Sequence, residues 1–209
     1  MTKRIPIGLQ LYSVRHECEK DLPGTLKRVA DMGYEGVEFA GYYGYAAEDL
    51  RKMLDDLGLV CCGTHTPLAS LLGDELPETV EFNKTLGNPY LIVPGLPSEC
   101  TASGDAWRRT AETFNEIDQR LRKFETFTGY HNHWTEFAEV DGEKPWDTFF
   151  SNTDERVIMQ VDFGNALRGG GDPVPYIEKY PGRALTVHVK DYSAALGDDA
   201  ITGAGDVDW

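Results

Sequence analysis

Residues that can bind a metal ion or transfer a proton recur where apolar runs of this chain give way to loops. They are Glu38, His65, the polar run 130–133, Asp162 and His188. In a barrel of alternating strands and helices, the strand ends open onto one face, so residues far apart in sequence converge on one site. The pattern favours a metal-centred enzyme.

Two of the five histidines, His131 and His133, lie two residues apart in the run 127–133. If the strand continues through both, their side chains share one face and Asn132 points to the other. Imidazoles paired in this way bind transition metals or polarise a substrate oxygen. A purely structural histidine pair is the alternative interpretation.

Asp162 ends the apolar run 157–162, and His188 follows the apolar run 185–187. A buried Asp is costly unless it is paired or bound to a metal, which favours a ligand role for Asp162. The alternative is an Asp that caps the following turn. Lys190 lies two residues after His188 and so on the same face of a strand, where its ammonium could hold a hydroxyl, a phosphate or a developing oxyanion.

For the candidates in the N-terminal part of the chain, a functional role and a structural role are about equally favoured. Glu38 points either into the barrel mouth or toward the helix layer, and His65 stands at a strand end where it could contact substrate. Gln10 and Tyr12, two apart on the first apolar run, could line the same cavity or simply pack. The glycine run 169–171 lacks the spacing of a phosphate-binding loop and is interpreted as a flexible turn.

Short β-rich runs alternate with segments of helical periodicity, which is typical of βα units around a parallel sheet. The expected strands are 7–12, 36–40, 60–65, 90–94, 127–133, 157–163 and 185–189. The expected helices are 22–32, 47–57, 76–86, 106–124, 145–150 and 173–179. A (β/α)8 barrel typically needs about 250 residues, so we expect a fragment that is about one βα unit short.

Composition limits the class of protein. The 209 residues, 41% of them hydrophobic, predict a single domain over 1–209. A formal charge of -15 disfavours a nucleic-acid partner. Since no apolar run is long enough for a membrane span and no signal peptide is evident, we expect a cytoplasmic protein without membrane contact. The four cysteines show no metal or disulfide spacing and are expected to be reduced.

Five segments share a resemblance to one family. They are GLQLYSVR at 8–15, GYEGVEF at 33–39, YHNH at 130–133 with Glu136 and Phe137, QVDFGN at 160–165, and VHVKD at 187–191. Over essentially the whole chain, they resemble the sugar phosphate isomerase/epimerase family of xylose isomerase-like TIM barrels. Its relatives include tagatose epimerases, inosose dehydratases and, more distantly, endonuclease IV. The resemblance implies an α/β fold, a (β/α)8 TIM barrel truncated here before its last helix and eighth strand.

The resemblance also implies a metal site. Family members typically hold a divalent metal with a Glu on the fifth strand, an Asp on the sixth, a His on the seventh and a Glu on the eighth. Asp162 and His188 match in type, whereas His131 stands at the fifth-strand position and the eighth strand is absent. The two glutamates that exchange the substrate proton in the epimerases are therefore not in evidence. Mn²⁺ is the expected ion, and Zn²⁺, Co²⁺, Mg²⁺ or Fe²⁺ would also suit these ligands.

The implied chemistry is proton abstraction next to a carbonyl, with a cation stabilising the enediolate. The catalytic candidates for base, substrate contact and oxyanion support are His133, Glu136 and Lys190. The substrate-binding candidates are Gln10, Glu38, His65 and Asn132.

We therefore expect a metal-dependent isomerase or epimerase of a sugar or keto-sugar, active in carbohydrate metabolism. A lyase or dehydratase of a keto-sugar or inosose would use the same enediolate. A phosphodiesterase acting on damaged DNA is disfavoured by the charge, and a non-catalytic sugar-binding barrel stays open. The expected partner is a small sugar, and a homo-oligomer is also open.

Overall fold

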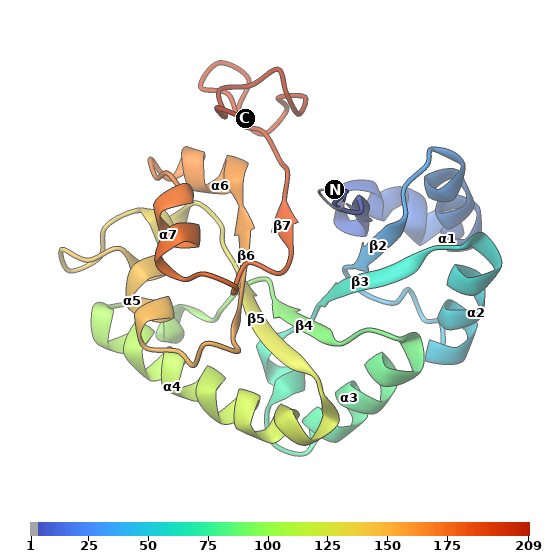
Figure 1. Cartoon of the computed structure of the whole chain (residues 1–209), viewed down its shortest axis with the longest axis horizontal. Helices are drawn as coiled ribbons and strands as arrows, with labels where there is room; N and C mark the ends of the chain where they lie inside the picture. The colour runs from blue at the N-terminus through green and yellow to red at the C-terminus, as the bar shows by residue number, and fades with distance from the viewer. Residues whose placement is uncertain (1–3) are drawn as a thin grey trace. The chain divides into compact units, whose positions relative to one another are not determined.

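The computed structural model describes residues 4–209, in which seven strands alternate with helices (Figure 1). The chain divides into two compact units: unit 1 ends at Leu91, and unit 2 runs from Ile92 to Trp209. Strand β4 (Tyr90–Val93) lies across this boundary. The single domain expected over 1–209 stays a prediction, and each unit is considered by itself.

Unit 1 contains three strands that pair in parallel, with β2 between β1 and β3. Its elements are β1 (Gly8–Gln10), α1 (Arg15–Asp31), β2 (Gly36–Phe39), α2 (Ala47–Leu57), β3 (Val60–His65) and α3 (Glu75–Leu86), with short 3-10 turns at Leu11–Val14 and Leu68–Leu71. The bounds of α2 and β3 confirm the predicted ones. In α2, Leu50 and Leu54 are buried while Arg51 pairs with Asp55 on the outer side.

Helix α1 begins seven residues before the predicted helix because the chain forms two helical segments in succession. The backbone of Asp21 is extended, with φ -159° and ψ 83°, and separates the two segments. The Asp21 carboxylate accepts a hydrogen bond from the Gly24 N–H at 3.0 Å, as an N-cap residue does. The predicted segment 22–32 therefore corresponds to the second part of α1.

Unit 2 holds three further parallel strands in which β6 lies between β5 and β7. Its elements are α4 (Gly104–Leu121), β5 (Phe127–His131), α5 (Pro145–Ser151), β6 (Ile158–Asp162), α6 (Phe163–Arg168), α7 (Val174–Lys179) and β7 (Val187–His188), with 3-10 turns at Ser98–Cys100, Arg122–Phe124 and Thr135–Phe137. No further strand follows β7 up to residue 209.

An aromatic cluster packs α4 and α5 against β5, which Figure 1 shows side by side in unit 2. Its members are Trp107, Phe114, Tyr130, Trp146 and Phe149, all 2% exposed or less. Edge-to-face contacts such as Phe114–Phe149, with ring centroids 4.9 Å apart, add to the free energy gained by burial. This cluster fixes the strand that carries His131.

The structure corrects one sequence interpretation and adds to another. Strand β5 ends at His131, so His133 lies in the bend that follows and does not share a strand face with it. The glycine run 169–171 is a turn, as predicted, but its glycines are also required by close packing, which the sequence interpretation did not include. A side chain at Gly169 would meet the Trp134 carbonyl, one at Gly171 would meet the Phe137 ring, and Gly170 has a φ of +75°.

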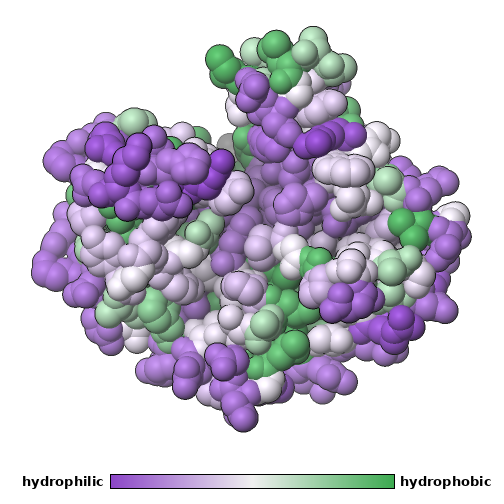
Figure 2. All heavy atoms as spheres, turned by 180° about the vertical axis from the view of Figure 1, so that it is seen from behind, coloured by the Kyte–Doolittle hydropathy of each residue, from purple (hydrophilic) through white to green (hydrophobic). Residues whose placement is uncertain are grey.

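Hydrophilic residues cover most of the surface drawn in Figure 2, in agreement with the large negative charge. Figure 2 shows apolar residues at its top, where Figure 1 places the C-terminal segment, and Leu196 and Ile201 of this segment are exposed. Between residues 4 and 209, no helix combines the length and apolar character needed to cross a bilayer.

Candidate active site

Asp162 lies at the junction of β6 and α6, and its two carboxylate oxygens have different partners. Oδ1 accepts a hydrogen bond from the Asn165 backbone N–H at 2.7 Å and so caps α6. Oδ2 lies 3.8 Å from Nδ1 of His188. Burial raises the pKa of Asp162, against the opposing effects of the Asn165 hydrogen bond and of His188. The cap and the approach to His188 therefore coexist in one side chain.

Three residues whose side chains can bind a metal lie at the ends of β5, β6 and β7. Asp162 and His188 are register partners on neighbouring strands, and the His131 and His188 ring centroids lie 4.6 Å apart. One nitrogen from each of these two rings lies within 4.8 Å of the other. Two imidazoles and a carboxylate are a donor set that suits a first-row divalent cation. The donor types of His131, Asp162 and His188 therefore suit a divalent cation, and their role as its ligands stays a prediction.

His133 is close to this set although it lies off the strand. Its ring centroid is 5.3 Å from that of His131, with the two planes nearly perpendicular. The His133 backbone N–H donates a 2.8 Å hydrogen bond to Glu136, which fixes the bend. The His133 ring thus lies next to the His131 ring, beside the three candidate ligands.

Asn132 joins the ends of β5 and β6 through its side-chain amide. Its Oδ1 accepts from the Asp162 N–H at 2.7 Å, and its Nδ2 donates to the Asp162 carbonyl at 3.0 Å. In return, Asn165 Nδ2 donates to the Asn132 carbonyl at 3.0 Å. The Asn132 side chain is fully buried, and these contacts favour a positioning role over the predicted substrate contact.

Glu136 is also held by the protein on both sides of its carboxylate. One oxygen accepts from the Tyr130 hydroxyl at 2.7 Å, and the other accepts from the His133 N–H. The residue is 3% exposed. Its catalytic role stays a prediction, while these contacts favour a role in holding the bend.

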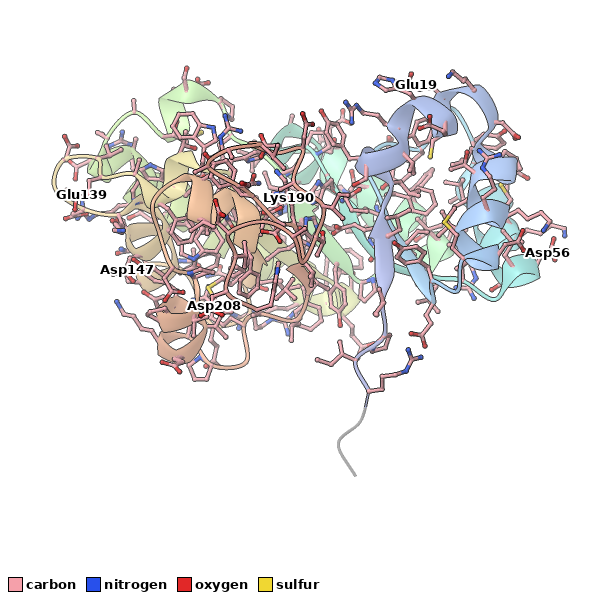
Figure 3. The ribbon with its side chains drawn as sticks, turned by 90° about the horizontal axis from the view of Figure 1, so that it is seen from above. Glu19, Asp56, Glu139, Asp147, Lys190 and Asp208 are labelled. Carbon is pink, nitrogen blue, oxygen red and sulfur yellow. The ribbon has the colours of Figure 1, made fainter. Side chains whose placement is uncertain are left out.

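Lys190 follows β7 and points toward α6. Its Nζ lies 3.0 Å from Asn165 Oδ1 and 3.0 Å from Asp198 Oδ1. In the view of Figure 3, Lys190 lies over the middle of the picture, whereas Glu139 and Asp147 lie at the outer edge of unit 2, and the Lys190 side chain is 38% exposed. Lys190 is thus two residues from His188 in the chain, and its ammonium contacts Asn165, whose backbone N–H binds Asp162.

The predicted candidates of unit 1 include three polar residues that lie close together. Gln10 Nε2 donates to Glu38 Oε2 at 2.8 Å, and His65 Nε2 lies 3.7 Å from the same oxygen. Gln10 and His65 end β1 and β3, and Glu38 is the last residue but one of β2, which lies between them. Glu38 is 4% exposed and faces these polar ends. Tyr12 is largely exposed. The Cζ of Arg15 lies over its ring, 4.3 Å from the ring centroid of Tyr12.

Sequence reasoning did not single out four residues near Lys190. Asn165 and Asp198 contact its ammonium, Arg168 pairs with Asp198, and Trp134 lies against Arg168. Asn165 had a usable signal, because an amide three residues after a capping Asp lies one helical turn from it. Arg168 and Asp198 had none, since they pair across thirty residues.

The four cysteines are free thiols, as predicted. Burial, together with the Glu38 carboxylate, raises the pKa of Cys62 to about 12, and burial raises the pKa of Cys61 as well. Neither is a ready nucleophile.

Comparison with known proteins identifies the family. Residues 26–209 match the model of the xylose isomerase-like TIM barrel. Among curated proteins, the chain is 26% identical over 188 residues to the rhizopine catabolism protein MocC of Rhizobium meliloti, covering 81% of this chain and 57% of that protein. It is 24% identical over 195 residues to an inosose dehydratase of Klebsiella pneumoniae, covering 83% and 64%. The chain thus spans less than two thirds of these relatives.

A solved structure gives the same result. The crystal structure of a sugar phosphate isomerase/epimerase from Parabacteroides distasonis is 30% identical, with a TM-score of 0.77, and the match covers 100% of this chain and 81% of that one. A second structure of that description from the same organism is 29% identical, with a TM-score of 0.81. On the match to residues 26–209 and this structural similarity, the chain belongs to the xylose isomerase-like TIM barrel family.

Proposed function

We propose that the protein is a divalent-metal-dependent isomerase or epimerase of a sugar or keto-sugar. The observation that carries the proposal is the approach of Asp162 Oδ2 to His188, with the His131 ring packed 4.6 Å from that of His188. These three residues would hold the ion, for which we propose Mn²⁺. Such an ion supplies Lewis acidity that stabilises negative charge on a carbonyl or enediolate oxygen.

The chain's own residues have complementary roles in this proposal. His133 takes the proton from the carbon next to the carbonyl, because an imidazole is a suitable base near neutral pH. Delivery of a solvent-derived proton to the opposite face of the same carbon gives an epimer. Delivery of a proton to the neighbouring carbon, with transfer of the hydroxyl proton between the two oxygens, gives an isomer. The Lys190 ammonium balances negative charge on the bound substrate, and Asn132 keeps the ends of β5 and β6 in register.

The polar group of unit 1 supplies substrate-binding candidates. Gln10, Glu38 and His65 offer an amide, a carboxylate and an imidazole at three strand ends. Donors and acceptors of this kind suit the hydroxyl groups of a sugar.

A dehydratase of a keto-sugar or inosose is the second candidate, and the similarity to inosose dehydratases favours it. Elimination begins with the same proton abstraction, after which the enediolate expels a β-hydroxyl as water. The two reactions differ only in the fate of this intermediate.

The first test is metal content by elemental analysis. We compare the natural chain with Asp162→Asn and His188→Ala after loading with Mn²⁺. Asp162→Asn keeps an oxygen that can cap α6 while removing the anionic ligand, so loss of metal would not reflect a lost helix cap. The exposed His16→Ala and Asp208→Asn serve as matched controls.

We expect near-stoichiometric metal in the natural chain and both controls, and loss of metal in both site variants. Metal retained in Asp162→Asn and His188→Ala, or no metal in the natural chain after loading, contradicts the proposal. NMR of keto-sugars in D₂O then separates the reactions. Deuterium incorporated next to the carbonyl without loss of a hydroxyl supports an isomerase or epimerase, and loss of water supports the dehydratase.

A further inference from the structure

We propose that Arg168 and Lys190 form a subsite for a phosphate or carboxylate group of a small molecule, and that Asp198 of the same chain fills this subsite in the structure. All three residues belong to unit 2. The inference rests on the proposed function only in placing the anionic group on the enzyme's substrate. Binding of the anion itself is independent of catalysis.

The Asp198 carboxylate uses each oxygen for a different cation. Oδ2 lies 2.6 Å from Nη1 of Arg168, and Oδ1 lies 3.0 Å from Nζ of Lys190. One oxyanion bridging a guanidinium and an ammonium is a common way for proteins to bind phosphates and carboxylates. Asp198 therefore shows where such a group would sit.

Both cations are also held by groups other than Asp198. The Trp134 ring lies against the Arg168 guanidinium, 5.6 Å from ring centroid to Cζ. Asn165 Oδ1 holds the Lys190 ammonium at 3.0 Å. Because these contacts persist when Asp198 leaves, the subsite is preorganised for another anion.

The contacts of Asp198 are of a kind that breaks readily. The side chains of Arg168, Lys190 and Asp198 are 40%, 38% and 43% exposed. Ion pairs this accessible to water contribute little free energy and weaken with salt. A ligand anion can therefore compete with Asp198 at modest concentration.

The C-terminal segment does not depend on Asp198 to stay in place. The buried carboxylate of Asp191 accepts hydrogen bonds from the N–H groups of Gly203, Gly205 and Val207 and from the Trp209 indole, at 2.8 to 3.2 Å. Gly164, at the start of α6, packs so closely on the Asp191 carbonyl that a Cβ would lie 2.6 Å from it. Asp198 can thus withdraw while the rest of the segment remains attached.

The subsite adjoins the proposed metal ligands through short connections. Asn165, which holds Lys190, also donates its backbone N–H to Asp162. Lys190 lies two residues after His188 in the chain. A molecule whose anionic group binds Arg168 and Lys190 would therefore extend toward Asp162 and His188, which points to a phosphorylated or carboxylated sugar as substrate.

The test measures binding of inorganic phosphate by isothermal titration calorimetry, on the full chain as purified and again after chelation. Asp198→Asn removes the internal competitor, so we expect phosphate to bind about tenfold more tightly than to the natural chain. Asp208→Asn removes the same charge from the same segment at an exposed position, and we expect binding within about twofold of the natural chain. Adding Arg168→Gln to Asp198→Asn should abolish binding.

Equal tightening in Asp198→Asn and Asp208→Asn would mean a general effect of net charge and would overturn the proposal. So would the absence of phosphate and acetate binding in Asp198→Asn at millimolar concentration. Binding of phosphate alone identifies a phosphorylated ligand, and comparable binding of acetate identifies a carboxylated one. Calorimetry on the chelated protein reports on the anion subsite alone, and elemental analysis reports on the metal site alone. Failure of one proposal can therefore be distinguished from failure of the other.

Discussion

Asn132→Ala tests whether the buried amide of Asn132 holds the site together or binds substrate. The substitution removes the 2.7 Å and 3.0 Å hydrogen bonds to the backbone of Asp162 and a third, 3.2 Å, to the His133 carbonyl. A buried backbone group that loses its partner costs about 1–3 kcal/mol. Because the Asp162 N–H and carbonyl both lose their partner, we expect the free energy of unfolding to fall by at least about 2 kcal/mol, and by about 4 kcal/mol if each group costs the middle of this range.

The assay is urea unfolding followed by tryptophan fluorescence. It reports on unit 2, because all four tryptophans lie after residue 92. With a slope of about 2 kcal/mol per molar urea, the expected loss lowers the midpoint by roughly 1–2 M. Metal content should fall in the same variant, since Asp162 loses its support.

Asn115→Ala is the matched control. Its amide also bridges two backbone groups, the Asp154 N–H at 2.6 Å and the Asn152 carbonyl at 3.0 Å, at a partly exposed place outside the site. Because water can replace these bonds, we expect a loss of about 1 kcal/mol and unchanged metal content. An Asn132→Ala protein as stable as the natural chain, with a raised KM alone, would refute the positioning role and support substrate contact.

Two further predictions concern packing and titration. Gly171→Ala should lower the free energy of unfolding by about 1–3 kcal/mol, because the new methyl group collides with the Phe137 ring. Gly95→Ala, where a Cβ meets nothing within 4 Å, should change the free energy by less than about 0.5 kcal/mol; similar urea midpoints for the two variants would contradict the collision. The raised pKa of Cys62 means that the folded state keeps a proton that the unfolded chain loses near pH 9. Stability from this group is therefore present below pH 9 and is lost as the pH rises toward about 12, by up to about 1.4 kcal/mol per pH unit. Urea unfolding at several pH values should show this decline reduced in Cys62→Ala and kept in Cys100→Ala, and identical slopes in all three proteins would contradict it.

The fold was predictable because its elements carry strong local patterns. In α2, apolar residues recur at helical spacing and Gly58, with a φ of 65°, ends the helix. Helix α6 was missed because its six residues directly follow a strand, and so short a segment has no readable period. The bend at His133 was missed because it depends on the Glu136 hydrogen bond, which sequence alone does not reveal.

The candidate site was predictable in its residue types more than in their roles. The strand ends carrying His131, Asp162 and His188 were found because polar residues stand out after apolar runs. Whether Asp162 would cap a helix or act as a metal ligand depended on the different directions of its two carboxylate oxygens, and these directions are set by the folded structure. The pairing of Arg168 with Asp198 likewise depends on how the C-terminal segment folds back.

The double use of Asp162 limits how this position could change in evolution. A glutamate would keep a metal-binding oxygen but would carry it one methylene further from the start of α6. A serine or asparagine would keep the helix cap but lose the negative charge. No other side chain satisfies both demands at the same reach, so a change of ligand at the proposed metal site would first require a new way of starting α6.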